Sequence, residues 1–187
     1  MKIFIDTEFV ENGVTIDLIS IGLVADDGRE YYAISTEFNP NKASQWVIDN
    51  VLNSLPPRWV NGSDPGFSPR LMGESMAWKS RDRIKEDIIE FCGESPEFWA
   101  EYGSYDWVAF CQLFGKMIDL PKGYPMRIRD VIQKCKDEMG LSSRQLPESL
   151  ETEGNHNALL GARSVKARYD WLVGLSARDN CGDWTSD

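Results

Sequence analysis

Three apolar runs rich in β-branched and aromatic residues open the chain, and they constrain its fold more than any other feature. They span residues 2–10, 14–25 and 30–38. The segments between them are short and contain an Asn-Gly turn at 11–13 and an Asp-Gly hairpin signal at 26–28. Strands joined this closely pair antiparallel, because a parallel crossover needs a dozen or more residues. The sequence therefore predicts a sheet that begins with a three-strand antiparallel meander.

The remainder of the chain alternates helical spacing with short strands. Helices are predicted at 43–52, 75–92, 106–115, 131–139 and 156–175. Short strands are predicted at 98–102 and 126–128, a long surface loop at 55–73, and a polar irregular segment at 141–155. In the helix at 75–92 the residues expected to face the core are Ile84, Ile88, Ile89 and Phe91. This order predicts an α/β fold with a mixed central sheet flanked by helices.

Length and composition limit the class of protein. The 187 residues suit a single domain, expected over 1–175 with a frayed tail at 176–187. No apolar run is long enough to span a membrane, and no signal peptide is expected from the N-terminal residues. The four cysteines show no CxxC spacing, which favours reduced thiols in a cytoplasmic protein.

The net charge is −10, with a pI near 4.7. A protein that coats phosphate backbones usually has the opposite sign. The charge does not exclude an enzyme that gathers carboxylates around metal ions, because such a site carries its own cations.

Asp6 and Glu8 lie two residues apart in the first predicted strand, so both side chains leave the same face of it. The strand is apolar enough to be buried. Buried neighbouring carboxylates repel each other and lose hydration, and a divalent cation between them offsets both effects. The pair predicts a metal site, although an Asp-x-Glu motif alone also fits a strand end with solvated acids.

Asp106 and His156 are the other candidate catalytic residues. Asp106 follows a short predicted strand and lies in the first turn of a helix, where it is placed either to cap the helix or to meet a ligand at the strand end. His156 is the only histidine and begins the last predicted helix. A lone histidine is most often structural or exposed, but beside a metal-bound water it accepts a proton near neutral pH. Ala158 and Ala162 allow this helix to approach the sheet closely.

Together these residues resemble the motifs of the DEDDh 3′→5′ exonucleases, which are Asp6-x-Glu8, Asp106 and His156-x-Ala158 in this chain. Within that group the chain is similar to the RNase AS-like exoribonucleases, relatives of RNase T, over residues 1–172. The stretches that carry this similarity are Phe4–Phe9, Leu18–Gly22, Asp27–Phe38, Trp78–Arg81 and Cys111–Gly115. The resemblance implies a ribonuclease H-like fold and the hydrolysis of phosphodiesters at RNA 3′ ends, releasing nucleoside monophosphates.

The resemblance further implies two Mg²⁺ or Mn²⁺ ions. Asp6 would bridge both ions, and Glu8 would bind one of them and contact the terminal nucleotide or the attacking water. Asp106 would bind the second ion, directly or through water, and His156 would be the general base for the attacking water. One metal then prepares the nucleophile while the other stabilises the leaving oxygen.

Gly161 departs from the family pattern. The third motif of the family is His-x-Ala-x-x-Asp, and its aspartate, which helps to hold a metal, is replaced here by glycine. Asp170 is about 13 Å further along a helix and is a poor substitute. Glu151 and Glu153 in the preceding loop are not expected to replace it either. Two alternatives to an active exoribonuclease stay open: a catalytically inactive relative that binds RNA 3′ ends, and a DNA-directed 3′→5′ exonuclease.

Aromatic and basic residues are candidates for holding the substrate. Phe9 follows the first motif and is placed either to stack on a terminal base or to lie in the core. Trp78 has the same two alternatives, whereas Trp107 is expected in the core. Arg81 and Arg163 are candidate phosphate contacts or solvated surface charges. By resemblance, the substrate is an adenine-rich RNA 3′ tail and the protein is a homodimer.

Overall fold

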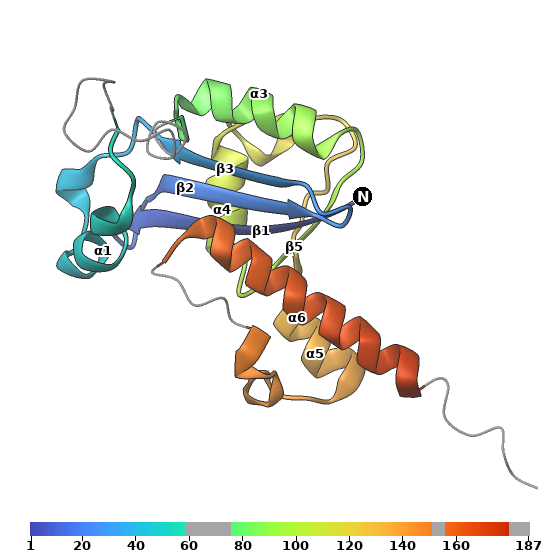
Figure 1. Ribbon diagram of the computed structural model, residues 1–187. Helices are drawn as coiled ribbons and strands as arrows, with labels where there is room; N and C mark the ends of the chain where they lie inside the picture. Colours follow the sequence, from blue (N-terminus) through green and yellow to red (C-terminus); the bar gives the residue numbers. More distant parts are fainter. Residues whose placement is uncertain (59–75, 151–155, 180–187) are drawn as a thin grey trace, which may run out of the picture.

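A computed structural model describes residues 1–58, 76–150 and 156–179. It contains a mixed six-stranded sheet with the order β4-β3-β2-β1-β5-β6 (Figure 1). The strands are β1 (Lys2–Glu11), β2 (Ile16–Ala25), β3 (Glu30–Ser35), β4 (Trp78–Lys79), β5 (Glu97–Ala100) and β6 (Arg129–Asp130). The α-helices of the described residues are α1 (Gln45–Asn50), α3 (Arg81–Cys92), α4 (Ser104–Gln112), α5 (Val131–Met139) and α6 (Ala158–Asp179). The predicted α/β class with a mixed sheet is confirmed.

The N-terminal meander is also confirmed. β1 pairs antiparallel with β2, and β2 pairs antiparallel with β3. Glycines with positive φ, Gly13 and Gly28, complete the two connecting turns. The ladder between β1 and β2 contains a register shift between Glu8 and Phe9, which marks a β-bulge immediately after the Asp-x-Glu motif.

β5 pairs with β1 in parallel, but only along Lys2–Phe4 of β1. β5 then ends at Ala100, and the chain turns into α4. From Ile5 onward, β1 therefore has β2 on one side and no strand on the other among the described residues. At this half-open edge of β1, elements that pack on opposite faces of the sheet can approach each other.

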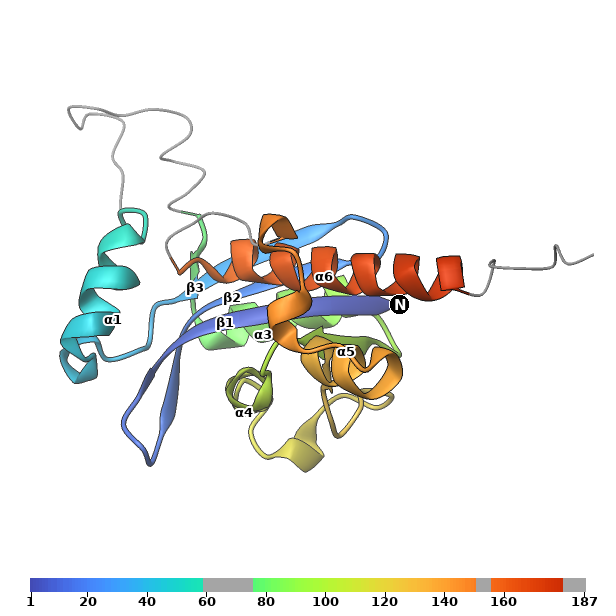
Figure 2. The same cartoon turned by 90° about the horizontal axis from the view of Figure 1, so that it is seen from below.

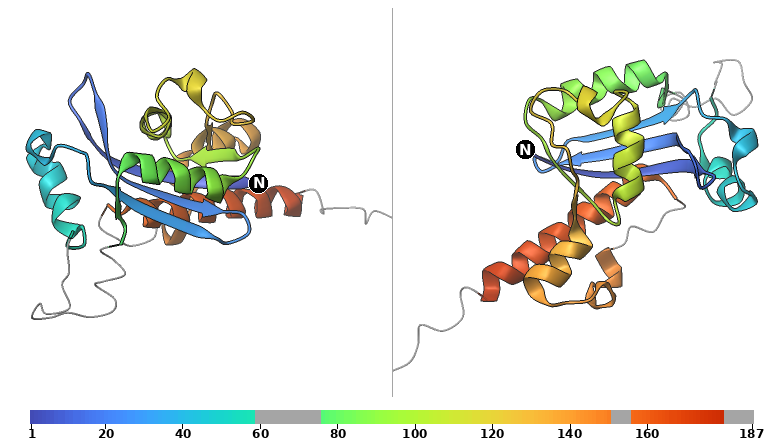
Figure 3. Two further views of the ribbon diagram at one scale, coloured as in Figure 1. Left: turned by 90° about the horizontal axis from the view of Figure 1, so that it is seen from above. Right: turned by 180° about the vertical axis from the view of Figure 1, so that it is seen from behind.

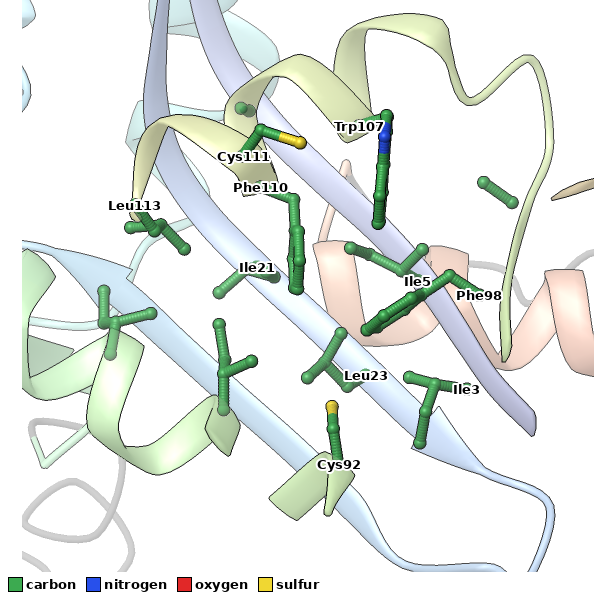
Figure 4. Close-up of a cluster of buried hydrophobic side chains, with 14 of the residues drawn as sticks. Ile3, Ile5, Ile21, Leu23, Cys92, Phe98, Trp107, Phe110, Cys111 and Leu113 are labelled. Atoms are coloured by element: carbon green, nitrogen blue, oxygen red, sulfur yellow. The ribbon is translucent and has the colours of Figure 1, made fainter. Parts of the chain in front are cut away.

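Hydrophobic residues cover both faces of the sheet. Residues such as Ile3, Ile5, Ile21, Phe98 and Phe110 form a buried cluster with α3 and α4 (Figure 4). The alternate residues of the strands pack on the other side, against α6 and α5. These are Phe4, Val24 and Trp99, with Val131 of α5 and Ala162 and Val165 of α6. α6 thus covers one face and α3 with α4 the other (Figure 2), while α5 lies beside α6 (Figure 3).

The first turn of α6 lies directly on the sheet. Ala158 and Ala162 are fully buried, as their small size predicted. A Cβ added at Gly22 of β2 would lie 2.2 Å from the backbone oxygen of Ala158. Only a glycine leaves room for this approach, because real Cβ atoms do not come that close.

Several predicted boundaries were wrong. The helix expected from residue 75 begins at Arg81, because Ser80 caps it and Trp78–Lys79 pair with β3 as strand β4. Ile89, expected in the core, is 44% exposed, and Cys92 takes the buried position one turn from Ile88. The strand expected at 126–128 is β6 at Arg129–Asp130.

The last helix also differs from its prediction. It begins at Ala158, two residues after His156, and continues to Asp179, so it includes residues 176–179 of the predicted tail. The loop predicted at 55–73 and the irregular segment at 141–155 fall partly outside the described residues, as does 180–187. Cys92, Cys111 and Cys135 are free thiols and are buried, and Cys181 lies outside the described residues. Within the described ranges no helix combines the length and apolarity needed to cross a membrane.

Candidate functional site

A cavity of about 370 Å³ opens at the half-open edge of β1. β1, α4 and the start of α6 supply its walls. Its lining residues are Asp6, Thr7, Glu8, Phe9, Asp106, His156, Asn157, Leu160, Gly161 and Ser164. The structure therefore brings together Asp6, Glu8, Asp106, His156 and Gly161, which the sequence singled out from three distant segments.

The surroundings of Asp6 and Glu8 destabilise the ionised forms of both carboxyl groups. Burial raises the pKa of Asp6 well above its ordinary value, and the negative charges of Asp106 and Glu8 raise it further. Burial also raises the pKa of Glu8 from 4.5 to about 7, with a smaller contribution from Asp106. Both shifts disfavour the ionised carboxylates, as expected where acidic groups share a poorly hydrated cavity. A bound cation would reverse this balance.

Asp106 is held by Thr7 of β1. The Thr7 backbone N–H and hydroxyl donate to the same carboxylate oxygen, at 2.8 and 2.6 Å respectively. Burial still raises the pKa of Asp106, because the hydrogen bonds from Thr7 offset desolvation only in part. Of the two alternatives for Asp106, the hydrogen bonds support a role at the cavity, since α4 has Gly103 at its N-cap position without a side-chain cap. Asp106 thereby ties α4 to β1.

His156 lies at the rim of the cavity, immediately before α6. Its backbone φ is +30°, an uncommon conformation for a residue other than glycine. Asn157 then caps α6, because its side-chain oxygen accepts hydrogen bonds from the backbone N–H groups of Leu159 (3.0 Å) and Leu160 (3.3 Å). The imidazole makes an edge contact with the indole of Trp46, with 4.7 Å between the ring centroids.

Gly161 lies against the side chain of Asp6. A Cβ added at position 161 would lie 2.2 Å from Oδ2 of Asp6 and 2.6 Å from its Cγ. The carboxylate of Asp6 thus occupies the space that any other side chain at 161 would enter.

The donor chemistry of the cavity suits a hard cation, since Mg²⁺ and Mn²⁺ bind carboxylate oxygens and keep several waters. Asp6, Glu8 and Asp106 provide such oxygens, and burial raises the pKa of all three carboxyl groups, so a bound cation would favour their ionised forms. They are not preassembled: among the described residues no three His, Cys, Asp or Glu side chains form a group that could already hold a metal. One oxygen of Asp106 already accepts two hydrogen bonds from Thr7.

The predicted substrate-binding residues divide into two groups. Phe9 lines the cavity and makes an edge contact with Tyr105, with ring centroids 5.7 Å apart. Trp78 does not line it: the Trp78 ring stacks with Phe38, and its indole N–H donates to the oxygen of Pro56.

The two predicted arginine contacts also lie outside the cavity lining. Arg81 pairs with Asp17 and lies 3.9 Å from Glu37, and Arg163 donates twice to Glu30, at 2.7 and 2.6 Å. These acidic partners hold the two guanidinium groups in the described structure. Contact of either arginine with substrate stays a prediction. Trp107 lies in the core beside Phe98 and Phe110, as expected (Figure 4).

Sequence reasoning missed several residues in and beside the cavity. Thr7 lies between the two motif carboxylates, yet its role depends on a partner 99 positions away, and no local pattern reveals that. Asn157 carried a usable signal, because Asn before an apolar helical run is a common N-cap. Trp46, which contacts His156, carried none.

Comparison with known proteins identifies the family of the chain. The model of the Rv2179c-like family, described as a 3'-5' exoribonuclease Rv2179c-like domain, matches residues 1–170. Two relatives from Mycobacterium tuberculosis are each 42% identical to the chain over 173 residues, covering 90% of this chain and 91% of the relative. They are 3'-5' exoribonuclease Rv2179c of strain ATCC 25618 / H37Rv and 3'-5' exoribonuclease MT2234.1 of strain CDC 1551 / Oshkosh. On the strength of both matches, the chain belongs to the Rv2179c-like family of 3'-5' exoribonuclease domains.

Proposed function

We propose that this protein is a metal-dependent 3′→5′ exoribonuclease of the DEDDh, RNase AS-like type with a ribonuclease H-like fold. The observation that carries the proposal is the single cavity lined by Asp6, Glu8, Asp106 and His156. Their order and types match the exonuclease motifs, and the family membership supplies the reaction class. The named activity of the two mycobacterial relatives is the same class of reaction.

Asp6, Glu8 and Asp106 would hold the cations. When bound, Mg²⁺ or Mn²⁺ supplies Lewis acidity toward the phosphodiester and lowers the pKa of a coordinated water. Asp6 is the central ligand of the proposal, since both other carboxylates raise its pKa and so lie within electrostatic reach. Asp106 contributes the oxygen that Thr7 does not engage.

His156 is the proposed general base. Its imidazole takes a proton from water as the water oxygen bonds to phosphorus, and the bond from phosphorus to the leaving 3′ oxygen breaks. The leaving oxygen gains a proton from solvent, and the imidazole returns its proton to solvent. The products are a nucleoside monophosphate and an RNA one nucleotide shorter. Placement of His156 at the open rim of the cavity suits this exchange with solvent.

The substrate we propose is an RNA 3′ end, with adenine-rich tails as the preferred class. Phe9 is the proposed contact for the terminal base, because it lines the cavity beside the Asp-x-Glu motif. The acidity of the chain, with a net charge of −10, favours a short strand end over long tracts of backbone. We further propose a homodimer that acts in the cytoplasm.

Gly161 supports a second candidate function, a relative that binds RNA ends without cutting them. The position lacks the carboxylate that the family motif places there, and Asp6 fills the space. An aspartate at 161 would fit only if the Asp6 side chain rotated away from its present position. We therefore expect the chain as it stands to bind cations more weakly than its Gly161→Asp variant.

The test uses a 3′-adenylated RNA labelled at its 5′ end, incubated with Mg²⁺, Mn²⁺ or EDTA. We expect a ladder of RNAs shortened from the 3′ end with either cation and none in EDTA. Asp6→Asn and His156→Ala should both abolish the ladder, whereas cation affinity, measured by calorimetry, should fall only for Asp6→Asn. Cleavage by Gly161→Asp alone would establish the second candidate. Preference for a DNA of the same sequence, or cleavage in EDTA, would contradict the proposal.

A further inference from the structure

Trp46 is the described aromatic residue that contacts His156. The two rings meet edge to face, with an interplanar angle of 71° and 4.7 Å between centroids. This is a favoured geometry for aromatic pairs. The contact joins α1, which follows the N-terminal meander, to the residue that precedes α6, far along the chain. Figure 1 shows α1 beside the end of the sheet at which α6 begins.

The backbone around His156 gives its imidazole little other support. His156 has a positive φ and precedes the capped start of α6, so the residue lies outside regular hydrogen bonding. Its side chain is exposed. Within the described residues, no hydrogen bond or ion pair to the ring accompanies the contact with Trp46. A general base needs a fixed orientation, because small displacements of a catalytic group cost large factors in rate.

α1, which carries Trp46, is anchored to the sheet. Val47 and Val51 pack in a hydrophobic cluster with Val10 of β1 and Ile19 of β2. The amide of Asn50 donates to the backbone oxygen of Trp46 at 2.8 Å. Trp46 itself is 55% exposed, so burial in the core does not explain this residue. A large aromatic on an anchored helix, exposed and in contact with a cavity residue, fits a role at the site.

We propose that Trp46 is a positioning residue, whose indole holds the imidazole of His156 at the cavity in the orientation that accepts the proton from water. This inference rests on the proposed function, in which His156 is the general base. Trp46 itself touches neither the water nor the phosphodiester. The contact makes α1, which lies between β3 and β4 in the sequence, part of the catalytic apparatus.

Nuclear magnetic resonance tests the contact without RNA or cation. His156 is the only histidine, so its ring C–H signals are unambiguous. The variants are Trp46→Ala, Trp46→Phe, which keeps an aromatic ring, and Gln45→Ala as a matched change in the same helix. We expect Trp46→Ala to move the His156 signals to the position of a freely rotating imidazole, and the other two variants to retain most of the displacement. Signals that are the same in Trp46→Ala and the unchanged protein would overturn the proposal.

Kinetics on the 3′-adenylated RNA test the consequence. In Trp46→Ala we expect kcat to fall by roughly 10- to 100-fold with little change in KM. Trp46→Phe should recover most of the loss, and Gln45→Ala should match the unchanged protein. A raised KM with unchanged kcat would overturn the proposal, because Trp46 would then act on RNA binding. If the unchanged protein cuts no RNA, the proposed function fails, and the resonance comparison alone decides whether Trp46 holds the imidazole.

Discussion

Replacing Glu8 by glutamine should stabilise the cation-free protein, and increasingly so as the pH rises. Burial and the charge of Asp106 raise the pKa of Glu8 from 4.5 to about 7. The folded state thus binds a proton more tightly than the unfolded state does. The stability contributed by this group is fully present below about pH 4.5 and is lost as the pH rises through about 7.

The magnitude follows from the pKa shift. Each unit corresponds to about 1.4 kcal/mol, so the rise of the Glu8 pKa from 4.5 to about 7 corresponds to at most about 3.5 kcal/mol. Glu8 is only partly buried by accessible surface, and solvent screening reduces this to about 2 kcal/mol. The free energy of unfolding of Glu8→Gln, relative to the unchanged protein, should therefore increase by about 2 kcal/mol between about pH 5 and about pH 8.

Urea unfolding followed by tryptophan fluorescence measures this difference in EDTA. Glu90→Gln, a change at an exposed position of α3, is the matched control and should show no such trend. Saturating Mn²⁺ should then stabilise the unchanged protein more than Glu8→Gln, because the cation binds the folded state and Glu8 is one of its proposed ligands. A difference that stays constant across this pH range would refute the reasoning from burial. Equal stabilisation of both proteins by Mn²⁺ would refute the proposed role of Glu8 as a ligand.

Three further substitutions test individual contacts of the fold. Thr7→Val removes the hydroxyl that donates to buried Asp106 and should lower the free energy of unfolding by about 1.5–3 kcal/mol, whereas Thr7→Ser should retain most of it; equal urea midpoints for both variants would contradict this. Gly22→Ala should destabilise the protein by about 1–3 kcal/mol or more, because its Cβ would lie 2.2 Å from Ala158, whereas Gly174→Ala, in open space on α6, should not destabilise it in the same thermal unfolding assay. Arg163→Gln breaks the exposed pair with Glu30 and should change stability by less than about 1 kcal/mol with KM for RNA unchanged; a raised KM would instead support substrate contact by Arg163.

Local patterns predicted the parts of this fold that depend on neighbours in the chain. The meander followed from apolar runs and short turns, and α5 was predicted with its observed bounds, at which Asp130 and Gly140 cap its two ends. The start of α3 was missed because Trp78–Lys79 pair with β3, a tertiary contact that overrides local helical spacing. Likewise, Ile89 has suitable spacing for the core, but no neighbouring element covers it fully.

The residues of the candidate site likewise divide into those that the sequence predicts and those that depend on tertiary contacts. Asp6, Glu8, Asp106 and His156 were recognisable because residue type and order carry the motif. The partners that hold or crowd them were not, since Thr7, Trp46 and the space at Gly161 matter only through contacts across the fold. The pairing of Arg81 and Arg163 with acidic residues was hidden for the same reason.

The close packing of Ala158 against Gly22 has a consequence for the order of folding. The cavity needs the first strand and the last helix together, so a nascent chain can build the meander early but cannot close the cavity until α6 has been synthesised. Until then, the apolar face of β1 and β2 that α6 covers is exposed to solvent, and this exposure promotes aggregation. A chain truncated before His156 should consequently be insoluble as well as inactive. The helix that completes the cavity therefore also shields the apolar face of the sheet from solvent.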